Sequence, residues 1–152
     1  MTKLACGCPG SQVRTLEKPQ QNDNAATGRL ASELRQWPTQ LHLVPPTAPY
    51  LQNAHLLIAS DCSPFAYAEF HRDFIKGRVL VNACPKLDDT SPYVDKLAAM
   101  IANNDIKSVT VTIMEVPCCR GLAMFAQKAI AQSGKDVPLE IVVIGVDGER
   151  RN

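Results

Sequence analysis

Six cysteines are the residues of this chain whose types and spacing are best suited to chemistry. Two form the motif Cys6-Gly7-Cys8 near the start of the chain, and four lie far downstream, at Cys62, Cys84, Cys118 and Cys119. A thiolate can attack an electrophile or bind a soft metal, and thiolate sites select zinc, copper(I) and iron-sulfur clusters. We therefore expect the cysteines to act as metal ligands or as nucleophiles.

The cysteine content predicts a reducing environment. Six cysteines in 152 residues is well below the density of small secreted proteins that depend on disulfides. The first residues contain no apolar stretch of signal-peptide length, and no window approaches the roughly eighteen apolar residues of a membrane span. We expect a cytoplasmic protein with no membrane partner.

The charge of the chain argues against nucleic acid as a partner. Its 16 Lys and Arg residues are balanced by 15 Asp and Glu residues, which leaves a net charge of +1 and no basic stripe. Binding to a phosphate backbone depends on such a stripe. The length of 152 residues fits a single folded domain.

Short apolar runs alternate with longer amphipathic stretches from residue 40 to residue 145. The runs are nearly continuous, which is typical of strands buried on both faces of a parallel sheet. Five strands are predicted, at residues 41–44, 56–59, 79–81, 109–114 and 141–144. Helices are predicted within 65–76, 91–104 and 121–133, the last ending at Gly134. The alternation predicts an α/β fold, a Rossmann-like parallel five-stranded sheet with helices on both faces.

The chain divides into three regions. The segment 18–27 has almost nothing to bury, and the residues around it are rich in Gln, Asn, Pro and Ser. We interpret residues 1–36 as a flexible N-terminal arm that carries the Cys6-Gly7-Cys8 motif. Residues 37–148 form the predicted α/β domain, which is expected to bind an iron-sulfur cluster, and residues 149–152 form a tail.

Four of the cysteines follow predicted strands. Cys62, Cys84 and the pair Cys118-Cys119 come directly after three separate strands. The carboxyl ends of parallel strands share one edge of a sheet, and ligands bind in the crevice outside that edge. The sequence therefore predicts a metal site there, although each thiol taken alone also fits a small buried apolar side chain.

A 4Fe-4S cluster accounts best for this set, because it needs four thiolates that converge from several directions. Zinc, another thiolate-bound metal or a role as a cluster carrier is the alternative, but the CxxC pairs typical of structural zinc sites are missing. The histidines His42, His55 and His71 do not restore a zinc pattern and fit surface or packing positions. Asp88-Asp89-Thr90 is interpreted as the N-cap of the following helix.

Cys6 and Cys8 have two interpretations. They are either an exposed, redox-prone tail or additional ligands that fold back onto the sheet edge. The expected ligands are Cys62, Cys84, Cys118 and Cys119, with Cys8 as the substitute or fifth thiolate. Adjacent cysteines seldom point the same way, and if only one of Cys118 and Cys119 ligates, Cys8 completes the four.

A nucleophilic cysteine is a further alternative. Residues 116–121 would place a thiol, the Arg120 cation and a glycine at a strand-to-helix turn, which suits a cysteine-dependent redox enzyme using Cys118 or Cys119. No general base is paired with these thiols in the sequence, and no glycine-rich phosphate loop is present. A redox or electron-transfer protein is therefore favoured over an enzyme.

Several segments are specific enough to compare with known families. They are LRQWP at 34–38, QLHLVPP at 40–46, DCSPFAY at 61–67, CPKLDD at 84–89 and EVPCC at 115–119, together with CPGS at 8–11. They resemble the C-terminal domain of a family of iron-sulfur-binding proteins of anaerobic bacteria and archaea that are known as 4Fe-4S ferredoxins. The resemblance covers about residues 34–148 and the CPGS segment.

The resemblance implies an iron-sulfur cluster and a role in electron transfer or redox sensing, with a redox partner protein. It implies that Cys8, Cys62, Cys84, Cys118 and Cys119 stand at the family's cysteine positions, whereas Cys6 is less typical. Family members usually carry an N-terminal dicluster ferredoxin domain, and this chain is expected to be a stand-alone form without it. A homodimer is an open alternative at this point.

Overall fold

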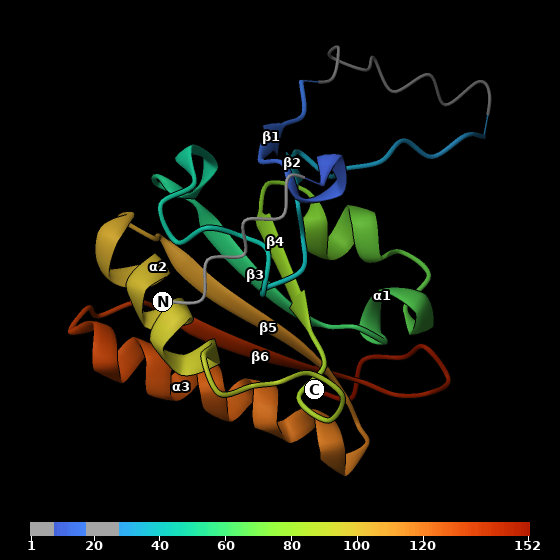
Figure 1. Ribbon diagram of the computed structural model, residues 1–152. Coiled ribbons are helices and arrows are strands. Elements are labelled where there is room, and N and C mark those ends of the chain that lie inside the picture. The colour runs from blue at the N-terminus through green and yellow to red at the C-terminus, as the bar shows by residue number, and fades with distance from the viewer. Residues whose placement is uncertain (1–7, 18–27) are drawn as a thin grey trace.

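The computed structural model describes residues 8–17 and 28–152, and its centre is a four-stranded parallel sheet (Figure 1). The spatial order is β4-β3-β5-β6, and every neighbouring pair is parallel. The strands are β3 (His55–Ser60), β4 (Val79–Ala83), β5 (Ser108–Met114) and β6 (Leu139–Ile144). The predicted α/β fold with a Rossmann-like parallel sheet is confirmed, with four strands instead of the expected five.

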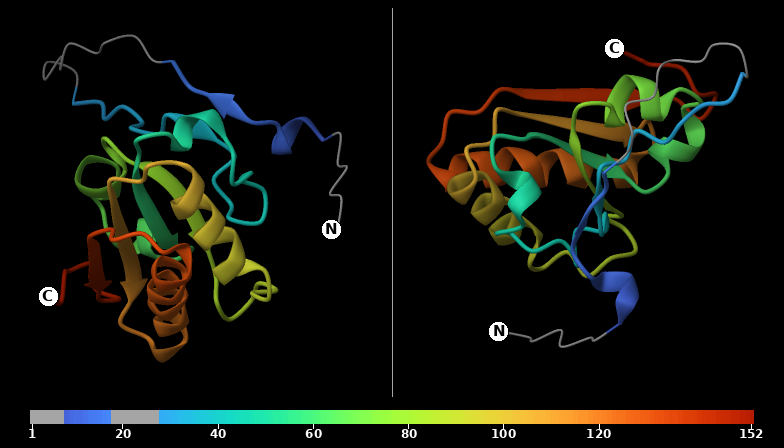
Figure 2. Two further views of the ribbon diagram at one scale, coloured as in Figure 1. Left: turned by 90° about the vertical axis from the view of Figure 1, so that its left-hand side faces the viewer. Right: turned by 90° about the horizontal axis from the view of Figure 1, so that it is seen from above.

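Helices cover both faces of this sheet (Figures 1 and 2). Helices α2 (Tyr93–Asn103) and α3 (Arg120–Ser133) pack against each other on one face. The short helix α1 (Ser63–Ala66) and the π-helical turn η4 (His71–Ile75) lie on the other face. The connections β3→β4 and β5→β6 cross the sheet in opposite directions, so right-handed crossovers place their helices on opposite faces.

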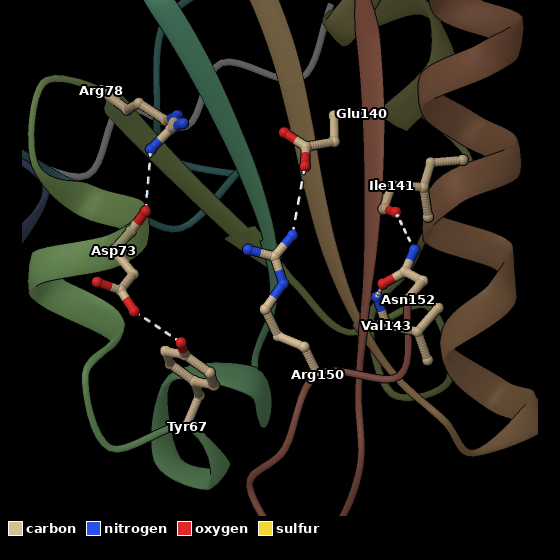
Figure 3. A network of polar contacts seen from close by, with 8 residues as sticks. All are labelled: Tyr67, Asp73, Arg78, Glu140, Ile141, Val143, Arg150 and Asn152. Carbon is tan, nitrogen blue, oxygen red and sulfur yellow. Dashed lines mark hydrogen bonds and ion pairs between the residues drawn. The ribbon is translucent and has the colours of Figure 1, made fainter.

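Two of the three predicted helices form as expected, and α3 ends at Gly134, whose φ of 72° suits glycine. The stretch 65–76 is instead divided between α1 and η4. The chain leaves the helical conformation at Tyr67, whose hydroxyl donates to the Asp73 carboxylate at 2.6 Å (Figure 3). This contact closes the bend between the two short elements.

The fifth predicted strand, at residues 41–44, is wrong. These residues form a turn ahead of Pro45 and Pro46, which lack the backbone N–H that a strand ladder uses. Leu41 and Val44 are fully buried, so the apolar run packs into the core without joining the sheet. The apolar pattern alone does not distinguish these two ways of burying side chains.

The segment 36–41 covers the free edge of β4. The Thr39 carbonyl accepts the Asn82 N–H at 2.9 Å, and the Leu41 N–H donates to the Asn82 carbonyl at 2.9 Å. Gln36, which is buried, donates its side-chain amide to the Leu80 carbonyl at 2.6 Å. The edge groups of β4 are thus satisfied by irregular backbone and one amide side chain.

The free edge of β6 is covered by residues 150–152 (Figure 3). Arg150 forms an antiparallel bridge with Ile144, and the Arg151 N–H donates to the Val143 carbonyl at 2.9 Å. The Asn152 side chain accepts from the Val143 N–H at 3.1 Å and donates to the Ile141 carbonyl at 2.8 Å. Both lateral edges of the sheet are therefore occupied.

Residues 8–17 of the expected N-terminal arm are attached to the domain. Strand β1 (Arg14–Thr15) pairs antiparallel with β2 (Gln36–Trp37), and the 3-10 turn η1 (Pro9–Ser11) precedes it. The indole N–H of Trp37 donates to the Gly10 carbonyl at 2.8 Å. In the described parts of the chain, no helix has the length and apolarity that a membrane span requires.

The role of Gln36 at the β4 edge predicts a measurable loss of stability. Replacing Gln36 by Leu leaves the buried Leu80 backbone without its partner, which lowers the free energy of unfolding by about 1–3 kcal/mol. Urea denaturation followed by circular dichroism measures this change. Gln127→Leu on the exposed side of α3 is the matched control, and we expect a change within about 0.5 kcal/mol. Equal stabilities of the two variants would contradict the edge-covering role.

Candidate functional site

The carboxyl ends of β3 and β5 mark the switch point of the sheet. The chain leaves β3 toward β4 on one side and leaves β5 toward β6 on the other. The loops that follow these two neighbouring strands therefore diverge and leave a crevice between them, the usual ligand site of an open parallel sheet. Cys62 stands in the first of these loops, and Cys118 and Cys119 stand in the second.

Cys62 lies two residues beyond β3 and is exposed. The next residue, Ser63, is fully buried and fixes this loop to the sheet. Its hydroxyl donates to the Ser60 carbonyl at 2.8 Å and lies 2.9 Å from the hydroxyl of Thr112 in β5. The thiol of Cys62 is thus presented to solvent by a loop anchored through buried hydroxyl groups.

Cys84 lies directly after β4 and is half-buried. Its N–H donates to the Asp88 carboxylate at 2.9 Å, and its carbonyl accepts the Asp88 N–H at 3.0 Å. The same carboxylate accepts the Tyr93 hydroxyl and, at 3.2 Å, the side-chain amide of Gln40. The interpretation of Asp88 as a helix N-cap is wrong: α2 has no side-chain cap, and Asp88 fixes the Cys84 loop.

The Asp88 carboxylate is stabilised in its charged form. Burial opposes ionisation, but the hydrogen bonds from Tyr93, from the Cys84 N–H and from Gln40 outweigh it and lower the Asp88 pKa. Burial and the Asp88 carboxylate together raise the pKa of the Tyr93 hydroxyl. The loop that carries Cys84 therefore depends on an ionised carboxylate.

Cys118 and Cys119 have different surroundings although they are adjacent. Both lie in the 3-10 turn η5 (Pro117–Cys119) that leads into α3. Cys118 is exposed, whereas only 6% of Cys119 is exposed. The expectation that the two thiols differ in direction agrees with this contrast in burial, and Cys118 is the one that a ligand from solvent can reach.

Burial raises the pKa of the Cys119 thiol, and the neighbouring Cys118 thiol acts in the same direction. The Met114 backbone and the Ser60 hydroxyl oppose this rise. Within the described residues the Ser60 hydroxyl is buried and has no hydrogen bond that meets the usual distance and angle limits. The Cys119 thiol, directly before α3, is therefore held in its protonated form near neutral pH.

The β4 loop and the start of α3 are in direct contact. A Cβ atom added at Gly121 would lie 3.3 Å from the Cβ of Pro85, so the glycine permits this close approach. The sheet thus brings Cys84, Cys118 and Cys119 to one edge together with Cys62, as expected from their positions after strands. Among the described residues, however, no group of three or more Cys, His, Asp or Glu side chains is arranged to hold a metal ion.

Cys8 lies apart from this edge. It precedes the η1 turn beside the β1–β2 ribbon, and Figure 1 and the left view of Figure 2 show this turn apart from the loop that follows β4. Cys8 is exposed and is not in a disulfide. Cys6 lies outside the described residues.

The contacts of the three histidines are with residues other than the cysteines. The His42 ring packs on Tyr93 with centroids 4.7 Å apart, and a His55 ring nitrogen lies 2.8 Å from the Ser108 hydroxyl. The His71 ring accepts the Glu33 N–H at 3.1 Å. These contacts agree with the surface and packing positions that the sequence suggested.

The sequence did not reveal the residues that fix the cysteine loops. Ser60, Ser63 and Thr112 form a buried group of hydroxyls, and Gln40 and Tyr93 converge on Asp88. Two signals were available: polar residues within the apolar run of β5, and a Ser-Pro pair directly after a cysteine. Neither indicates which partner a hydroxyl group contacts.

Comparison with known proteins gives the family and one relative. A family profile described as a Rossmann-like domain matches residues 48–151. A protein of Archaeoglobus fulgidus that is described as uncharacterized is 33% identical over 116 residues, which is 76% of this chain and 81% of the relative. No solved structure matches the chain significantly.

The lowered pKa of Asp88 predicts pH-dependent stability. A carboxyl whose folded pKa is below its unfolded value stabilises the fold above the unfolded pKa, and this contribution is lost as the pH falls through the folded pKa. We expect Asp88→Asn to lower the free energy of unfolding by about 1–3 kcal/mol at pH 7. Urea denaturation should show the difference from the parent protein shrinking in acid. Asp136→Asn, at an exposed position, is the control and should change little at either pH.

The different burial of the thiols predicts different reactivity. Alkylation with iodoacetamide at pH 7, followed by peptide mass spectrometry, should modify Cys62 and Cys118 well before Cys119, because Cys119 is buried and its raised pKa reduces the thiolate fraction. In urea, Cys119 should react at a rate close to theirs. Equal rates in the folded protein would contradict the burial of Cys119.

Proposed function

Because the chain belongs to the Rossmann-like domain family, we propose that it holds a 4Fe-4S cluster at the edge where such sheets bind ligands. The observation that carries the proposal is that Cys62, Cys84 and Cys118 each follow a different strand at this one edge, with the buried Cys119 next to Cys118. The proposed role is electron transfer or redox sensing with a protein partner. This matches the resemblance to the 4Fe-4S ferredoxins in its cysteine positions.

The chemistry of the donors fits such a cluster. All five described cysteines are free, and thiolates are the ligands of iron-sulfur clusters. Cys62 and Cys118 are exposed in the loops of neighbouring strands, and Cys84 is half-buried. Because no three of these side chains are arranged to hold a metal within the described chain, binding requires the loops to draw together. Coupling between metal binding and local folding is general in such sites.

The residues around the thiols have distinct parts in this proposal. Cys62 and Cys118 would bind first, since they are accessible, while Cys84 and Cys119 would supply the remaining ligands within one chain. Asp88 and Ser63 hold the loops that carry Cys84 and Cys62. When bound, the cluster would supply a one-electron redox couple. Its exposure at the edge favours exchange with a partner or sensitivity to oxidants.

Two other functions use the same residues. Zinc or another thiolate-bound metal, including a metal or cluster in transit, would suit the soft donor set. A cysteine-dependent redox reaction is favoured by one observation: an exposed Cys118 thiol lies beside a buried Cys119 thiol and next to the exposed Arg120. Metal analysis separates these possibilities from the iron-sulfur proposal.

Anaerobic reconstitution with iron and sulfide tests the proposal. We expect stoichiometric iron and sulfide, visible absorption of a cluster, and an electron paramagnetic resonance signal after reduction. Near-stoichiometric zinc without iron would replace the cluster by a zinc site. A protein that takes up no metal at all would leave only the cysteine-dependent alternative.

Serine variants identify the ligands. Cys62→Ser and Cys118→Ser should each reduce retained iron to background, because each removes an accessible thiolate. Cys8→Ser is the matched control and should retain the cluster, since its thiol lies on the η1 side of the domain. Loss of iron in Cys8→Ser would show that the arm reaches the site and supplies the fourth ligand.

A further inference from the structure

A pocket of about 240 Å³ lies at the amino end of β4, between this strand and the β1–β2 ribbon (Figure 1). Its walls come from β1, from β2, from the 3-10 turn η3 (Pro49–Leu51) and from the turn that leads from η4 into β4. Val79, the first residue of β4, lines the pocket, whereas Cys84 follows the last. Five extended residues span about 16 Å, so this pocket is separate from the cysteine edge. We call it the ribbon pocket.

The charged side chains that line the ribbon pocket are both cationic. They are Arg35 and Arg78, and among the described residues no acidic side chain lines the pocket. Arg35 is exposed and has a carboxylate partner in Glu33 at 3.6 Å. Arg78 is half-buried and forms no ion pair within the described parts of the chain. The pocket therefore contains a half-buried positive charge without a negative partner.

The Arg78 guanidinium is held by backbone groups of η4. One of its nitrogens, Nη1, donates to the Phe74 carbonyl at 2.9 Å and to the Asp73 carbonyl at 3.3 Å (Figure 3). The Asp73 carboxylate is engaged elsewhere, by the Tyr67 hydroxyl and by Arg72. A guanidinium has further N–H groups that can contact a carboxylate or phosphate side by side. Fixing one nitrogen in place orients these groups before a ligand arrives.

A hydrogen-bond donor without a partner adjoins this charge. Tyr50 lines the ribbon pocket, and its hydroxyl is buried with no hydrogen-bond partner among the described residues. Burial raises the pKa of Tyr50 to about 12, so the hydroxyl keeps its proton at neutral pH. An unpaired buried donor is unfavourable, and a ligand oxygen in the pocket would satisfy it.

We propose that the ribbon pocket binds a small organic anion through one carboxylate or phosphate group, with Arg78 contacting the charge and Tyr50 donating to it. The volume is below the roughly 300–1,000 Å³ of most ligand pockets, which favours a small molecule over a dinucleotide. Thr15 and Val79 supply neutral surface for the body of the ligand. The inference is independent of the proposed function, because it uses no cysteine.

Titration of the metal-free full chain, followed by amide nuclear magnetic resonance, tests the proposal. The probes are benzoate, phenyl phosphate and the uncharged benzyl alcohol at millimolar concentrations. We expect saturable shifts with at least one anion at the amides of Gly77, Arg78 and Val79, and none at Cys118. The anion that binds more tightly identifies the head group. Absence of saturable shifts with both anions, or equal binding of benzyl alcohol, would overturn the proposal.

Variants of the two polar groups separate binding from folding. Arg78→Gln should weaken binding of the anion about tenfold or more, because it removes a charge-assisted contact. Tyr50→Phe should weaken binding several-fold while its thermal melting temperature stays the same or rises, because only an unpaired buried hydroxyl is lost. Arg29→Gln is the matched control, since Arg29 is exposed and lies outside the pocket lining, and we expect unchanged affinity.

Unchanged affinity in Arg78→Gln would overturn the proposal. If this variant fails to fold, Tyr50→Phe decides alone, and unchanged affinity in that protein would overturn the proposal. Iron uptake by the parent protein is measured separately and should be the same in Tyr50→Phe. Failure of the anion site and failure of the cluster proposal are therefore distinguishable.

Discussion

The pairing of β3 with two parallel neighbours is the constraint on which the rest of the structure depends. β3 hydrogen-bonds to β4 on one side and to β5 on the other, so the chain crosses from β3 to β4 and then back over β3 to β5. Right-handed crossovers then place η4 and α2 on opposite faces, and the further crossover from β5 to β6 places α3 beside α2. They also turn the loops after β3 and β5 away from each other. Cys62 and Cys118 lie outside the core because the chain leaves the sheet in opposite directions after β3 and after β5.

Polar contacts decide how these loops are held. The loop after β3 is fixed through the buried Ser63 hydroxyl, and the loop after β4 is fixed through the Asp88 carboxylate. Neither contact involves a thiol side chain, so the loops keep their positions without a metal.

The sequence predicts the sheet well because β3, β4, β5 and β6 are nearly continuous apolar runs. It also predicts the end of α3, since Gly134 adopts a φ of 72° that other residues rarely take. It fails at residues 41–44, where burial of Leu41 and Val44 comes from a turn instead of a strand. Placement of the thiols at one edge follows from topology. That the described side chains form no metal-holding group does not follow from topology, because the positions of the loops depend on contacts between residues distant in the chain, such as Asp88 with Gln40.

The covered edges of the sheet limit how this protein can associate. Gln36 and the backbone from Thr39 to Leu41 occupy the side of β4, and residues 150–152 occupy the side of β6. A second chain therefore finds no row of unpaired backbone groups along which to add a strand. Growth of the sheet sideways into fibres is blocked at both ends.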